Sequence, residues 1–223
     1  MKTVDLTCFS DVLCVWAWIG ELRLAELRRT HGEAVRVRQR FCSVFGDTAL
    51  KMQVNWGSKG GHEGFAAHLA HVVEGFPELS LHPDLWRGVR PASSLPAHLV
   101  LKAVQAQEAQ GGPEGLGDRA ITLTRKAFFE QGRDIASRAV LDAVLAEAGA
   151  DLADVHARLD RGEAHAALST DYQEAQALGV KGSPSLVLNE GRQTLYGNVG
   201  YRIIEANIEG LLREPTAGAA SWC

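Results

Sequence analysis

The sequence predicts an α/β fold in which a long helical segment interrupts a small sheet. Strand patterns occur only near the two ends of the 223-residue chain, while residues 47–179 carry helix signals instead. Residues 1–46 show the order strand, helix, strand, which is typical of a βαβ unit. With 46% hydrophobic residues, the chain can form one core with a large insertion.

The βαβ unit is read from three consecutive patterns. The segment "TVDLTCF" alternates apolar and polar residues, which predicts a strand over 3–9. Ser10 or Asp11 can cap the following helix, whose apolar side chains recur at helical spacing until Gly32 ends it. The β-branched and aromatic residues of "AVRVRQRFC" predict a second strand over 35–42, joined by a right-handed crossover.

The middle of the chain contains helix patterns with readable ends. The segment "SSLPAHLVLKAVQAQEAQGG" has serine caps, an early proline and a closing glycine pair. The segment "TDYQEAQALG" offers a capping box from Thr170 to Gln173. Strand signals return only at 185–189 and 193–197, before a last helix, "YRIIEANIEGLL".

The order β-α-β, helices, then β-β-α is that of a thioredoxin-like fold interrupted by an α-helical insertion domain. We expect residues 1–46 and 180–213 to form the thioredoxin-like core and residues 47–179 to form the insertion. Residues 214–223 are small and polar, which predicts a flexible tail.

Composition narrows the range of functions. The net charge is −4 and no Lys/Arg block is interleaved with aromatic residues, so a nucleic-acid partner is not expected. No apolar stretch approaches the ~18 residues of a membrane span, and the N-terminus lacks the apolar centre of a secretory signal. We therefore expect a cytoplasmic protein with no membrane association, in a compartment where thiols are mostly reduced.

Cys14 is the candidate catalytic residue. It lies between a predicted strand and a predicted helix, where unpaired backbone N–H groups and the helix dipole favour negative charge. Such a position can lower a thiol pKa from about 8.5 to roughly 3.5–7.5. The pattern predicts a thiolate that titrates well below 8.5 and reacts fastest among the four cysteines. The alternative is a buried cysteine that packs as a small hydrophobic residue.

A second motif, "GVKGSPSLVL", puts Ser183-Pro184 directly before a predicted strand. Together with "FSDVLCVWAWIG", "RPASSLPAHLVLKAV" and "RKAFFEQGRDIASRAVLDAVLAEAG", it resembles the DsbA-like branch of the thioredoxin superfamily, specifically its cytoplasmic FrnE-type members. The resemblance implies a cis Ser183-Pro184 bond that faces Cys14, with Ser183 pairing with an extended peptide or with glutathione. It also implies a thiol–disulfide oxidoreductase that acts through a mixed disulfide on a disulfide-containing protein or a small-molecule thiol substrate.

The chain departs from the usual motif of this family, C-P-W-C, because it has Cys14-Val15-Trp16-Ala17. Ala17 therefore stands where the resolving cysteine is missing. Three explanations stay open: a one-thiol enzyme that uses glutathione as the resolving co-substrate, resolution by Cys42 or Cys223, or an engineered replacement that traps the mixed disulfide. No tightly bound cofactor is expected, and a homodimer is an open alternative because relatives are often dimers.

The remaining candidates have supporting roles. Trp16 is expected to pack or to line the substrate groove, and Asp11 either caps the helix or tunes Cys14. Cys8 lies on the strand face of Val4 and Leu6, which predicts a structural role. We predict no metal site, because His62, His68 and His71 lack a fourth ligand at suitable spacing.

Two other functions fit parts of this pattern. The kappa-class glutathione transferases and the 2-hydroxychromene-2-carboxylate isomerases share the inserted thioredoxin layout and need no second cysteine, which fits Ala17. Their usual Ser-Pro-Tyr-Ser stretch is missing from this sequence. A non-catalytic protein that binds peptides in the groove beside Pro184 is the third hypothesis.

Overall fold

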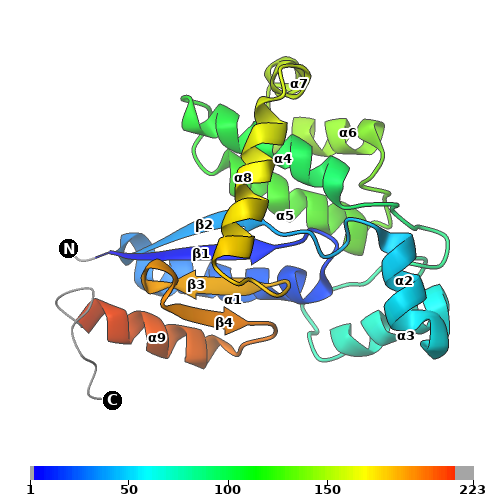
Figure 1. Cartoon of the computed structure of the whole chain (residues 1–223), viewed down its shortest axis with the longest axis horizontal. Helices are drawn as coiled ribbons and strands as arrows, with labels where there is room; N and C mark the ends of the chain where they lie inside the picture. The colour runs from blue at the N-terminus through cyan, green and yellow to red at the C-terminus, as the bar shows by residue number, and fades with distance from the viewer. Residues whose placement is uncertain (1–2, 214–223) are drawn as a thin grey trace.

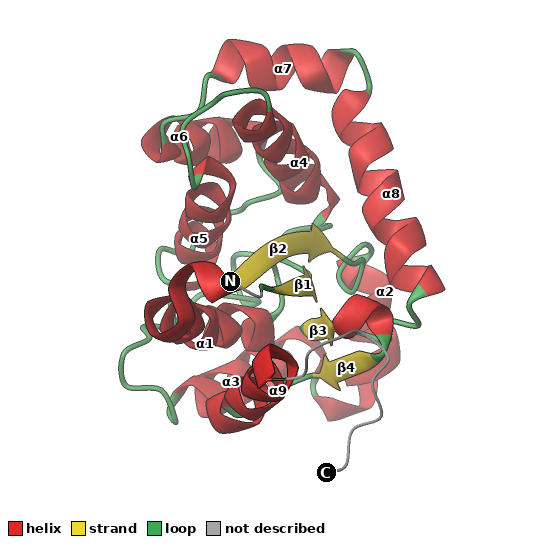
Figure 2. Cartoon of the chain, turned by 90° about the vertical axis from the view of Figure 1, so that its left-hand side faces the viewer, coloured by secondary structure: helices red, strands yellow, loops and turns green. Residues whose placement is uncertain are grey.

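The computed structural model describes residues 3–213, and they form the predicted α/β fold. In this part of the chain one sheet has the strand order β2-β1-β3-β4 (Figure 2). β1 and β2 are parallel, while β3 is antiparallel to both β1 and β4. The strands are β1 Val4–Ser10, β2 Val35–Phe41, β3 Ser185–Leu188 and β4 Gln193–Tyr196. Each lies within one residue of its predicted range, so the strand predictions are confirmed.

Helices cover both faces of the sheet. α1 (Val15–His31) and α9 (Tyr201–Arg213) contribute apolar side chains to one cluster with β1, β2 and β3. α8 (Glu163–Ala177) covers the other face, where Ala175 packs with Phe9 and Val187 (Figure 1). The alternating strand residues therefore point to two separate apolar layers.

The segment between β2 and β3 is helical, as predicted. Apart from the isolated bridge Leu85–Val89, its described residues contain no strand pairing. α4–α7 gather beside β2, while α2 and α3 lie beyond the end of β1 (Figure 1). The additional helices are α2 Thr48–Trp56, α3 Gly61–Val73, α4 Leu95–Ala109, α5 Leu116–Phe129, α6 Arg138–Ala148 and α7 Leu152–Asp160.

The division into a core domain and an insertion domain stays a prediction. α8 lies within the predicted insertion but packs directly on the sheet, so apolar burial is shared across the proposed boundary. The predicted tail, residues 214–223, lies outside the described residues.

One predicted helix cap is wrong. α8 begins after Gly162, at φ 76, because the Ala-rich turns that follow favour helix. Thr170 therefore lies inside the helix, where its hydroxyl donates to the Ala166 carbonyl oxygen at 3.1 Å. The serines predicted before α4 do precede it: Ser94 is the N-cap residue, with its hydroxyl donating to Asp11, and the Ser93 Oγ accepts the Leu95 N–H at 3.0 Å.

None of the helices within residues 3–213 is both long enough and apolar enough to cross a bilayer.

Candidate active site

Cys14 lies at the N-cap of α1, where the chain leaves β1. Its backbone is extended, at φ −85 and ψ 117. Its N–H donates to the Asp11 carbonyl oxygen at 3.1 Å, and its own carbonyl accepts from the N–H groups of Ala17 and Trp18 at 3.1 Å each. The strand–turn–helix setting read from the sequence is therefore present.

The Ser183-Pro184 motif meets Cys14 at this turn. The Ser183-Pro184 peptide bond is cis, as predicted. The Cys14 Sγ donates to the Ser183 carbonyl oxygen at 3.2 Å. The Asp11 N–H donates to the Ser183 Oγ at 2.9 Å, so the two loops are joined by side-chain and backbone bonds. Two loops that lie far apart in the sequence therefore come together around the Cys14 thiol.

The Cys14 thiol is deeply buried, with 6% of the residue exposed. Burial raises the pKa of this thiol, and the nearby charge of Asp11 adds to the effect. Hydrogen bonds from Ser183 and from the backbone N–H groups of Ala17 and Trp16 oppose the shift but do not cancel it. The predicted lowered pKa is wrong for this structure, because the loss of hydration outweighs the helix N-terminus.

We expect alkylation of Cys14 by iodoacetamide to stay slow near pH 7 and to rise only above pH ~8.5. A thiol whose pKa is raised forms its reactive thiolate at higher pH than a free cysteine. Peptide mass spectrometry of the alkylated protein measures the pH profile of Cys14 separately from the other cysteines. A midpoint below pH ~8.5 would contradict the expected direction.

Asp11 holds the turn in place with a fully buried carboxylate. Its Oδ1 accepts from the Leu13 N–H at 3.0 Å, which is the local capping role that the sequence suggested. Its Oδ2 accepts from the N–H groups of Val44 and Phe45 and from the Ser94 hydroxyl, at 2.9, 2.8 and 2.9 Å. The carboxylate therefore joins the β1–α1 turn to the β2–α2 loop and to α4.

His98 was missed by the sequence analysis. This buried side chain accepts the Val12 N–H through Nε2 at 3.2 Å, and its Nδ1 lies 3.1 Å from the Tyr172 hydroxyl. Burial lowers the pKa of His98 to about 4, so the ring is neutral near pH 7. No local pattern identifies it, because Val12 lies 86 residues away in the sequence.

Ala17 faces a small cavity of about 20 Å³, close to the size of a single water molecule. Cys8, Pro184 and Arg125 also line this cavity. Arg125 is almost fully buried and binds Glu21 and the Ser10 hydroxyl at 2.6 and 2.7 Å. Within the described part of the chain, its Nε has no hydrogen-bond partner. Ala17 and Pro184 therefore border the same small unfilled space.

The other cysteines lie in different surroundings. Cys8 packs with Val4 and Leu6, as expected for a structural role, and burial raises its pKa to about 11. Cys42 directly follows β2, and its Sγ lies 3.9 Å from the Gly182 carbonyl oxygen. Cys223 lies outside the described residues.

Trp16 is half-buried against the apolar cluster that contains Cys14. Its contact with a substrate stays a prediction. No group of three or more His, Cys, Asp or Glu within residues 3–213 is arranged to hold a metal ion.

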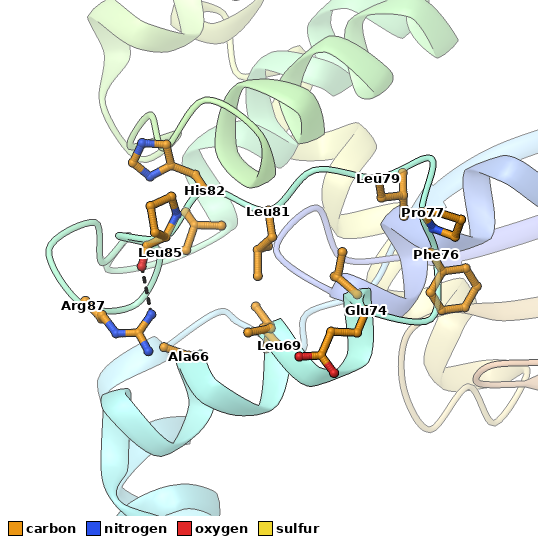
Figure 3. A pocket seen from close by; sticks show the side chains of 13 residues that line it. Ala66, Leu69, Glu74, Phe76, Pro77, Leu79, Leu81, His82, Leu85 and Arg87 are labelled. Atoms are coloured by element: carbon orange, nitrogen blue, oxygen red, sulfur yellow. Dashed lines mark hydrogen bonds between the residues drawn. The ribbon is translucent and has the colours of Figure 1, made fainter.

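A larger cavity, about 430 Å³, lies between α3 and the segment that follows it (Figure 3). Its walls are mostly apolar, and Leu69 and Leu81 point toward one another across it (Figure 3). At one end Arg87 donates to the Pro83 carbonyl oxygen at 2.8 Å and pairs with Glu63. None of the predicted site residues lines this cavity.

Comparison with known proteins identifies the family. A family model described as the DSBA-like thioredoxin domain matches residues 5–209. The chain belongs to this family. The members of the DSBA-like family include thiol–disulfide oxidoreductases, which agrees with the pairing of Cys14 with the cis-proline loop. No curated protein matches the chain.

Solved structures share this fold at low sequence identity. A probable DsbA oxidoreductase from Streptomyces coelicolor is 20% identical with a TM-score of 0.73, and the match covers 98% of this chain and 94% of that chain. The cytosolic disulfide reductase DsbM from Pseudomonas aeruginosa, solved with GSH, is 21% identical with a TM-score of 0.67, covering 92% and 99%. A 2-hydroxychromene-2-carboxylate isomerase is 16% identical with a TM-score of 0.65, covering 94% and 96%. These similarities support the fold.

Proposed function

We propose that the chain is a thiol–disulfide exchange enzyme that acts through Cys14 and a mixed disulfide. The observation that carries the proposal is the 3.2 Å contact between the Cys14 Sγ and the carbonyl of Ser183, the residue before the cis-proline. The Cys14 thiolate attacks one sulfur of a substrate disulfide. A bond forms between the two sulfurs, and the other substrate sulfur leaves as a thiolate that takes up a proton.

The loop at residues 182–184 positions the substrate in this proposal. In the resting enzyme the Ser183 carbonyl accepts from the Cys14 thiol. Once Cys14 becomes part of a disulfide, it can no longer donate, and the carbonyl is free to accept an N–H from the extended backbone of the substrate. Trp16, half-buried beside Cys14, is the neighbouring aromatic surface for the substrate side chains.

The mixed disulfide must be released by a second thiol, because Ala17 supplies none. We propose glutathione as the thiol from solution that returns the enzyme to its reduced state in a reducing cytoplasm. The structural similarity to DsbM, a cytosolic disulfide reductase solved with GSH, supports this choice of co-substrate and compartment. The buried thiol and its raised pKa fit an enzyme whose cysteine is protected until a substrate displaces the surrounding groups.

The test is incubation with oxidised glutathione at pH 8, followed by acid quench and peptide mass spectrometry. We expect glutathione on Cys14, and Cys14→Ser to reduce both this adduct and disulfide reductase activity by at least about a hundredfold. Cys8→Ala is the matched control, because it removes another buried thiol and should keep the adduct. A protein that never carries glutathione on Cys14 would contradict the proposed function.

A glutathione-dependent isomerase or transferase is the second candidate. Ala17 favours it, because such an enzyme needs no resolving cysteine. One variant distinguishes the two functions. Cys14→Ser abolishes an exchange reaction, whereas a hydroxyl at this position can still bind glutathione for isomerisation.

A further inference from the structure

Cys42 shares the cis-proline loop with Cys14. Its Sγ lies 3.9 Å from the Gly182 carbonyl oxygen, while the Cys14 Sγ lies 3.2 Å from the Ser183 carbonyl oxygen. Gly182 and Ser183 are consecutive residues, so the two sulfurs contact adjacent carbonyl groups of one short loop. Both cysteines have 6% of their surface exposed.

The backbone N–H groups of the two cysteines bond to consecutive residues. The Cys42 N–H donates to the Ser10 carbonyl oxygen at 3.1 Å, and the Cys14 N–H donates to the Asp11 carbonyl oxygen at 3.1 Å. Each cysteine therefore has one contact at the end of β1 and one with the loop at 182–184.

Charge bears on the reactivity of Cys42. Burial is the largest cause that raises the pKa of Cys42, followed by the charge of Asp11 and then by the charges of thiolates at Cys14 and Cys8. Conversion of Cys14 into a disulfide removes one of these charges, while burial and Asp11 still hold the pKa of Cys42 above its ordinary value.

Cys8 does not share this arrangement. It packs with Val4 and Leu6 under α1 and α9, whereas Cys42 packs with Phe9 and Val187 on the face covered by α8. Within residues 3–213 no hydrogen bond joins the Cys8 thiol to the loop at 182–184. Cys8 shares the small cavity with Pro184, but among the described cysteines the contacts between a sulfur and a carbonyl of this loop are those of Cys14 and Cys42.

We propose that Cys42 is the internal resolving thiol of this site, an inference that rests on the proposed function of Cys14. The Cys42 sulfur attacks the Cys14 sulfur of the mixed disulfide, the bond to the substrate sulfur breaks, and the released substrate thiolate takes the proton of Cys42. The products are a Cys14–Cys42 disulfide and a reduced substrate. Two equivalents of a monothiol reductant of the glutathione class then restore both thiols. Closure of this disulfide requires the two Cα atoms to lie within ~7 Å of each other.

The experiment measures the fate of one equivalent of oxidised glutathione added to the reduced full-length protein carrying Cys223→Ser. Acid-quenched samples are followed over time by intact mass, and the disulfides are mapped on non-reduced peptides. We expect a short-lived glutathione adduct, then a Cys14–Cys42 linked peptide pair, with both halves of the glutathione released as thiols. In Cys42→Ala the adduct on Cys14 should persist at least about tenfold longer, with only one half released. Cys8→Ala is the control and should behave like the parent.

The outcomes separate the two proposals. A stable glutathione adduct on Cys14 in the parent protein, with no linked peptide pair, overturns the role of Cys42 and leaves the proposed function intact. No adduct at any time and no linked pair overturns the proposed function itself. Peptide mapping of the parent needs no substitution at Cys42, so a folding defect in that variant cannot hide the result.

Discussion

Replacing Asp11 by alanine is expected to lower the free energy of unfolding by about 3–5 kcal/mol, because four buried hydrogen-bond donors lose their acceptor. The Asp11 carboxylate is fully buried and accepts from the backbone of Leu13, Val44 and Phe45 and from the Ser94 hydroxyl. Alanine would leave these donors buried without an acceptor, and each such donor costs about 1–3 kcal/mol before any rearrangement. Urea unfolding followed by circular dichroism measures the loss.

Two further variants test whether the loss of stability comes from the Asp11 carboxylate. Ser94→Ala removes one donor and keeps the carboxylate, so it should cost about 1 kcal/mol. Asp11→Asn keeps one acceptor oxygen but turns an amide N–H₂ toward existing donors, so its cost should fall between the other two. Asp11→Asn should also lower the pKa of Cys14, because the charge of Asp11 raises it. If Asp11→Ala costs less than Ser94→Ala, the carboxylate does not hold these segments together.

The order of strands and helices could be predicted because its signals are local. The alternation in β1 and the spacing of apolar residues in α1 each depend on a few neighbouring residues. The start of α8 could not be predicted in this way. Thr170 fits a cap pattern, but the preceding Ala-rich turns continue the helix through it.

The site was predicted only in part for a related reason. Cys14 and the cis Ser183-Pro184 bond were identified from two motifs and a family resemblance. The partners of Asp11 were not, because Val44, Phe45 and Ser94 lie 33, 34 and 83 residues away from it. Cys42 was one of two candidates for a second thiol. Its contact with the loop before β3 depends on where the pairing of β1 with β2 places the end of β2.

The direction of the Cys14 pKa shift could not be predicted from the residues next to Cys14 in the sequence. A cysteine at a helix N-terminus is expected to be acidic when water can reach the sulfur. Here most of the first turn of α1 is buried, and the apolar cluster that contains Cys14 also includes residues far away in the sequence, such as Leu85 and Trp86. Desolvation by groups far away in the sequence therefore decides the sign.

Replacing Ala17 by cysteine is expected to speed resolution of a Cys14–glutathione disulfide by at least about a hundredfold over 1 mM glutathione. Cys14 is the N-cap residue and residue 17 lies three positions later, so the two side chains start from the same face of the first turn. The cavity of about 20 Å³ beside Ala17 gives room for a sulfur atom. An internal thiol with an effective concentration of only about 0.1 M already exceeds millimolar glutathione a hundredfold, and well-oriented groups reach far higher values.

The measurement uses a Cys42→Ala, Cys223→Ser background, so that the internal route through Cys42 does not mask the new one. Decay of the Cys14 adduct is followed by quench and mass spectrometry, with reduction of insulin as the activity assay. Ala17→Ser is the matched control, because it adds a polar atom of similar reach without a thiol and should leave the decay rate unchanged. Equal decay rates for Ala17→Cys and Ala17→Ser would mean that a thiol at residue 17 cannot reach the Cys14 sulfur. Faster decay in Ala17→Cys than in Ala17→Ser would show that a thiol at residue 17 can resolve the Cys14 adduct without Cys42.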